Sequence, residues 1–148
     1  MAELLHRHNV TVADLVALDP TASAVDAGLI VVTCSWSASE PVTARDQAVA
    51  EVDPGAQHWR SESTGDAEFE SWIHLWVSDH RWSHSSLDRV FALVSNDWTS
   101  DVIVCDQQCT WLYHPYDGGA DVLAPSEAVR DSLAQRHQSW LSGRPDGL

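Results

Sequence analysis

The sequence predicts an α+β fold, in which a mainly antiparallel sheet of about five strands packs against two or three helices. Residues 71–77 alternate Trp72, His74 and Trp76 with Ile73, Leu75 and Val77, which is the period of a strand. Because both sets are bulky, we expect this strand to lie inside the sheet. Residues 102–105 and 110–113 are apolar runs joined by a short polar turn, which predicts a hairpin.

The helical prediction depends on residues 87–94. Leu87, Val90, Phe91 and Val94 are spaced i, i+3, i+4 and i+7, and the preceding Ser85 is expected to cap this helix. The chain contains no internal repeat and no long linker. We therefore expect a single α+β domain over residues 1–148.

The remaining elements follow in chain order. Leu4 and Leu5 suggest the end of a short strand, and Thr11 with Asp14 predicts a capped helix that ends before Pro20. Residues 29–33 are β-branched and apolar, as in a buried central strand. Residues 37–56 read as a loop with one helical turn near 44–51, followed by a strand over 57–62 and a tip at 63–66.

The C-terminal part contains one turn, one apolar run and one helix. Asp117-Gly118-Gly119 predicts a turn in which the glycines take positive φ, and an apolar run follows over 121–124. Pro125-Ser126 then begins the last helix. Its expected apolar stripe is Val129, Leu133, His137, Trp140 and Leu141.

Composition excludes several kinds of partner. Acidic residues number 22 against 8 basic ones, which are all arginine, so the formal net charge is -14. This charge opposes binding to nucleic acids and to anionic membranes. No apolar run is long enough to span a membrane, and the odd set of three cysteines fits reduced thiols. We therefore expect a cytoplasmic protein without a cofactor.

The sequence contains eight tryptophans, several times ordinary usage. Most of them are expected to pack in the core, but Trp59, Trp82 and Trp98 fall at the ends of elements, where aromatic rings often anchor a partner. An acidic surface with such rings suits a module that sequesters a basic protein, as immunity proteins do with toxins. The residues expected to face this partner are Trp82, Trp98, Asp97, Asp101, Tyr116 and Asp117. Excess acids cluster at 62–70 and 97–106.

The segment from Trp111 onward is the most distinctive. It reads Trp-Leu-Tyr-His-Pro-Tyr-Asp-Gly-Gly-Ala-Asp, then Arg130-Asp131, and ends Trp140-Leu141-Ser142 before Arg144-Pro145-Asp146-Gly147-Leu148. Together with His6-Arg7-His8-Asn9, this segment resembles a family of small, largely actinobacterial proteins of unknown function. The resemblance implies a fold and an ancestry but no activity.

Two alternatives to the binding module remain open. His114, Asp117 and Asp121 surround the predicted turn, and imidazole with two carboxylates can bind a divalent ion, as in a small metal-dependent hydrolase. His80 and His84 have the H-x-x-x-H spacing of zinc sites but lack the glutamate that would follow His80. The second alternative is a stand-alone domain of unknown function, in which the turn serves folding alone.

Overall fold

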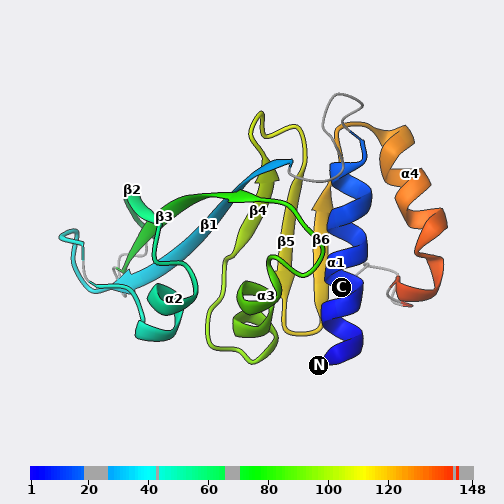
Figure 1. Cartoon of the computed structure of the whole chain (residues 1–148). Helices are drawn as coiled ribbons and strands as arrows, with labels where there is room; N and C mark the ends of the chain where they lie inside the picture. Colours follow the sequence, from blue (N-terminus) through cyan, green and yellow to red (C-terminus); the bar gives the residue numbers. More distant parts are fainter. Residues whose placement is uncertain (19–26, 43, 66–70, 142, 144–148) are drawn as a thin grey trace.

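A computed structural model describes residues 1–18, 27–42, 44–65, 71–141 and 143 (Figure 1). The elements in order are α1 (Ala2–Val16), β1 (Gly28–Ser37), α2 (Gln47–Val52), β2 (Gln57–Ser63), β3 (Trp72–Arg81), α3 (Asp88–Ser95), β4 (Ile103–Asp106), β5 (Leu112–Tyr116), β6 (Gly119–Leu123), α4 (Glu127–Arg136) and a 3-10 turn (Gln138–Trp140). None of the described helices is both long and apolar enough to cross a membrane.

The strands form one sheet in the order β2-β3-β1-β4-β5-β6, and every neighbouring pair is antiparallel. The α+β class and the antiparallel sheet are therefore confirmed. The sheet has six strands and not five, because the apolar run after the glycines pairs with β5 as β6. The internal positions expected for residues 29–33 and 71–77 are confirmed, since β1 and β3 each have two neighbours.

The described helices cover one face of the sheet (Figure 1). The core lies between α1, α3 and this face, and Leu15, Phe91, Val31 and Tyr113 are almost completely buried in it. The predicted stripe of α3 is confirmed, because its four apolar residues are all buried. The predicted hairpin is also confirmed, as β4 pairs with β5.

The helix predicted after Thr11 is confirmed as the second half of α1, but the strand and the cap predicted before it are wrong. The segment expected to end a strand lies inside α1, which begins at Ala2, well before the predicted cap at Thr11. The Thr11 hydroxyl donates to the Arg7 carbonyl inside this helix instead of capping it. Residues 6–9 are polar, but His8 and Asn9 are buried because each bonds a distant part of the chain.

The start of α3 also differs from its predicted cap. Leu87 precedes the helix and makes no side-chain cap hydrogen bond, while Ser85 has a left-handed φ of 67°. Asn9 of α1 organises this start, because its amide donates to Asp88 (2.6 Å) and its oxygen accepts from the Ser85 N–H (3.0 Å). A side chain from another helix thus replaces the local cap.

Of the smaller elements, the helical turn near 44–51 is confirmed as α2 and the strand over 57–62 as β2. Ser126 caps α4 by accepting from the Val129 N–H, as predicted. The last helix ends at Arg136, so Trp140 belongs to the 3-10 turn. Three predicted features lie wholly or partly outside the described residues: the tip at 63–66 in part, the acids at 66–70, and the tail at 144–148.

Candidate binding surfaces

The centre of the sheet face opposite the helices is apolar, whereas Arg60, Glu62 and Asp79 share this face nearer the β2 edge. Leu29, Val31 and Val104 point into the core, so their neighbours along each strand point to the other face. These outward side chains are half-buried and pair across the central strands: Ile73, Leu75 and Val77 on β3, Ile30 and Val32 on β1, Ile103 on β4 and Leu112 on β5. We call this set the outer face. No described helix covers it.

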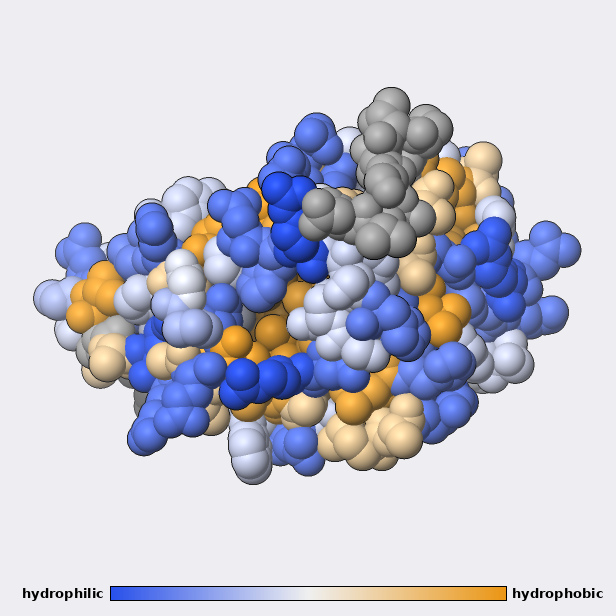
Figure 2. Space-filling model, viewed as in Figure 1, coloured by the Kyte–Doolittle hydropathy of each residue, from blue (hydrophilic) through white to orange (hydrophobic). Residues whose placement is uncertain are grey.

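The helix-bearing face is different. Hydrophilic residues predominate there, and hydrophobic residues show between them in smaller groups (Figure 2). An antiparallel sheet with one face in the core ordinarily turns polar residues to water on the other face. Contiguous apolar side chains on a surface usually indicate a binding region. The outer face is therefore a candidate interface.

A hollow of about 440 Å³ adjoins the outer face where β1 ends. Trp36 of β1 and Trp98 of the loop between α3 and β4 both line it, with their side chains 49% and 64% exposed. Asp46 and Asp97 line it as well. The hollow thus combines exposed aromatic rings with carboxylates, which is the chemistry that attracts a Lys or Arg side chain.

The loop beside the hollow has unusual backbone geometry. Asp97 and Asp101, which flank Trp98, have left-handed φ values of 57° and 55°. Aspartate tolerates this conformation better than most residues, at a cost of about 1 kcal/mol or more. The loop is held to β1, because the Cys34 thiol lies 3.4 Å from the Ser100 carbonyl oxygen. Burial and the nearby Asp101 carboxylate raise the pKa of Cys34 to about 11, so the thiol stays protonated.

The other predicted partner-facing residues lie elsewhere. Trp82 is 4% exposed and packs in the core, so the expectation that its ring meets a partner is wrong. It follows β3 directly, and the chain turns there toward α3, which carries the ring inward. Tyr116 and Asp117 are exposed at the β5–β6 turn.

The β5–β6 turn brings His114 opposite Asp121 in the strand register. Burial and the carboxylates of Asp121 and Asp117 raise the pKa of Tyr116. Within the described ranges, no three His, Cys, Asp or Glu side chains are grouped closely enough to hold a metal ion. The predicted metal-dependent hydrolase therefore has no ligand set in that part of the chain.

The positive φ predicted for the two glycines of this turn is wrong, because neither glycine has one. A Cβ on Gly119 would come within 3.2 Å of the Tyr116 ring, so a larger residue there would have to displace this exposed ring slightly.

The two histidines with zinc-like spacing, His80 and His84, have different surroundings. His84 is exposed in the turn after β3. The Nε2 atom of His80 lies 3.0 Å from the Ser78 hydroxyl and 3.4 Å from the Asp53 carboxylate. No local sequence pattern reveals this Ser-His-Asp group, because Asp53 follows α2 whereas Ser78 and His80 lie on β3.

This group does not have the geometry of a nucleophilic triad. In a triad, the carboxylate bonds one imidazole nitrogen and the serine bonds the other. Here Ser78 and Asp53 both contact Nε2, and the Ser78 hydroxyl also donates to Asp53 (2.7 Å). Burial alone would raise the pKa of Asp53, but the bonds from His80 and Ser78 outweigh burial and lower it. The group joins α2 to the sheet.

A cavity of about 300 Å³ lies between α1, the β5–β6 hairpin and α4. Val122, Leu133 and Ala134 supply apolar lining, and Arg7 and Arg130 are among the charged residues. His8 and Tyr113 also line it. The distinctive N-terminal and C-terminal segments of the sequence thus meet at one cavity.

His8 and Tyr113 form a buried pair beside this cavity. The Nδ1 atom of His8 lies 2.6 Å from the Tyr113 hydroxyl, and each side chain is about 1% exposed. Burial lowers the pKa of His8 to about 4 and raises the pKa of Tyr113. Both side chains are consequently neutral at physiological pH.

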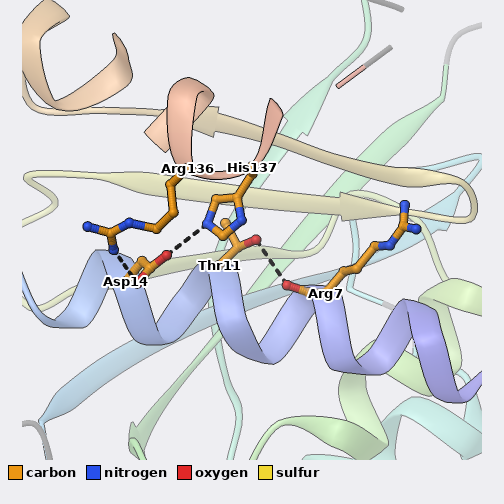
Figure 3. A network of polar contacts seen from close by, with 5 residues as sticks. All are labelled: Arg7, Thr11, Asp14, Arg136 and His137. Atoms are coloured by element: carbon orange, nitrogen blue, oxygen red, sulfur yellow. Dashed lines mark hydrogen bonds and ion pairs between the residues drawn. The ribbon is translucent and has the colours of Figure 1, made fainter. Parts of the chain in front are cut away.

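One carboxylate joins α4 to α1 (Figure 3). Asp14 accepts from Arg136 Nη1 (2.5 Å) and from His137 Nε2 (2.7 Å). The His137 ring stacks on Trp140 with centroids 4.4 Å apart, and the Arg7 guanidinium lies 5.4 Å from the Trp140 ring centroid. Since α4 itself has no buried residue, these contacts are important for holding α4 against α1.

We expect Asp14→Asn to loosen α4. The variant removes the charge from two hydrogen bonds, so amide exchange in α4 should accelerate about tenfold, corresponding to about 1.4 kcal/mol of local stability. Hydrogen exchange followed by mass spectrometry measures this. Asp131→Asn is the control, because its partner Arg130 is exposed on α4 itself. Equal exchange in both variants would contradict the attachment through Asp14.

The fold is an antiparallel sheet with helices on one face and an apolar outer face. A family model described as a domain of unknown function, DUF3885, matches residues 1–145, and the chain belongs to that family. This confirms the expected membership in a family of unknown function. No curated protein and no solved structure shows a significant match to the chain.

Proposed function

We propose that this protein is a binding module that docks a basic protein through its outer face and the hollow between Trp36 and Trp98. The observation that supports this most is the uncovered apolar outer face, which is continuous with Trp36. Apolar area supplies affinity, and the exposed tryptophans are the residue type that most often dominates interface energetics.

Charge identifies the kind of partner. The net charge of -14 favours encounter with a cationic surface and opposes pairing of two copies of this chain. Asp97 and Asp101 lie on the same loop as Trp98, and Asp46 faces the hollow from the start of α2. A Lys or Arg side chain of the partner is expected to enter between the two rings.

The test uses tagged protein to capture partners from the native host at low and moderate salt. We expect to capture a partner of basic isoelectric point. The Trp98→Ser variant should bind this partner about thirtyfold more weakly than the wild type, as expected when a central anchor residue is removed. Trp59→Ser is the matched control, because Trp59 is similarly exposed at 60% but lies on the edge strand β2.

The charges are tested separately. Asp97→Asn with Asp101→Asn removes two carboxylates while keeping a residue that tolerates left-handed φ. This variant should associate more slowly at low salt and show a weaker salt dependence than the wild type. An acidic partner, or equal capture by the Trp98 and Trp59 variants, would overturn the proposal.

A further inference from the structure

We propose that the cavity between α1, the β5–β6 hairpin and α4 binds a small amphiphilic anion, namely a carboxylate with an apolar tail. This site is separate from the outer face, since the cavity lies on the side of the sheet that carries the helices. Its volume of about 300 Å³ is near the lower end of small-molecule sites, which span about 300–1,000 Å³.

The interior of the cavity suits an apolar tail. Ala120 and Val122 of β6 face Leu133 and Ala134 of α4 across it. The His8–Tyr113 pair adds polar atoms without charge, because burial keeps the imidazole neutral. A charged ligand group would therefore gain no counter-charge from this pair.

The cationic groups lie on the helices around the cavity. Arg7 on α1 and Arg130 on α4 line it, and Arg136 lies next to the lining residue His137. Three of the eight basic residues of a strongly acidic chain thus gather around one cavity. Arg136 is already paired with Asp14, which leaves Arg7 and Arg130 as the groups that would meet the carboxylate.

The acidic residues that pair with these two arginines do not prevent a ligand carboxylate from binding to them. Arg7 pairs through Nε with Glu3, and Arg130 pairs with Asp131, and both carboxylates are about two-thirds exposed. Exposed ion pairs of this kind are worth about 1 kcal/mol or less, so a ligand carboxylate can share these arginines. Asp121 also lines the cavity and lowers its local positive charge by one.

The experiment titrates the isotopically labelled chain of 148 residues with octanoate, octanol and octylammonium, and follows backbone amide shifts by NMR. We expect saturable binding of octanoate, with the largest shifts in α1, β6 and α4, and clearly weaker binding of the other two probes. Arg7→Gln and Arg130→Gln should each weaken octanoate binding about fivefold, as for partly exposed ion pairs.

Two further variants test whether octanoate binds in this cavity. Arg60→Gln removes an arginine from β2 at the far edge of the sheet and should leave the affinity unchanged. Ala134→Met fills the cavity and should abolish binding of every probe in a protein whose circular dichroism matches the wild type. Equal affinity for octanol, tighter binding of octylammonium, or shifts that do not saturate would overturn the proposal.

Discussion

Replacing Trp82 by alanine is expected to cost about 3–5 kcal/mol of unfolding free energy, because it removes a large buried ring and leaves a cavity. Trp82 is 4% exposed and lies in the core with residues of α1 and α3. A domain of this size is typically stable by about 5–15 kcal/mol, so the variant should lose a large fraction of its stability. Urea unfolding followed by circular dichroism measures the change.

Trp98→Ala is the matched comparison. Its ring is 64% exposed, so its loss should change the unfolding free energy by about 0.5 kcal/mol or less. The two tryptophans therefore separate a core role from a surface role within one residue type. A Trp82 variant as stable as the Trp98 variant would show that Trp82 is not a core residue.

Local periodicity predicted the elements whose burial repeats along the chain. The alternation over 71–77 identified β3, and the spacing of Leu87, Val90, Phe91 and Val94 identified α3. Both patterns arise because one side of the element faces the core throughout. The strand β6 was missed as a strand because it is short and mixes Gly, Asp and apolar residues.

The helix α1 was only partly predictable. Its residues 6–9 are polar, and a polar stretch normally argues against a buried helix face. Here the polar groups have distant partners: His8 bonds Tyr113, and Asn9 bonds Asp88. Because these partners lie 105 and 79 residues away in the chain, no local pattern could reveal them.

The candidate surfaces show the same limit. Asp97, Trp98 and Asp101 are close in sequence, so their presence on one loop was predictable. That Trp36 joins Trp98 at the hollow depends on the position of β1 beside β4, which is a property of the whole sheet. The cavity likewise draws on residues 4–11, 113–124 and 130–141, which only the fold brings together.

The buried imidazole of His8 makes stability depend on pH. Its pKa falls from 6.5 to about 4 on folding, so between these values the unfolded chain binds a proton that the folded chain does not. The folded state keeps its full stability with respect to His8 above about pH 6.5, and this stability falls as the pH drops toward about 4. At about 1.4 kcal/mol per pH unit, the loss amounts to roughly 3 kcal/mol.

His8→Gln tests this assignment, because glutamine is polar but does not titrate. The variant should be less stable than wild type near neutral pH, where it loses the contact with Tyr113, yet it should lose less stability on acidification. Tyr113→Phe is the control, since it removes the hydroxyl but leaves the imidazole buried and should keep the wild-type pH dependence. Urea unfolding measured at several pH values between about 4 and 7 distinguishes them. If His8→Gln keeps the full acid sensitivity, another group must be responsible for it.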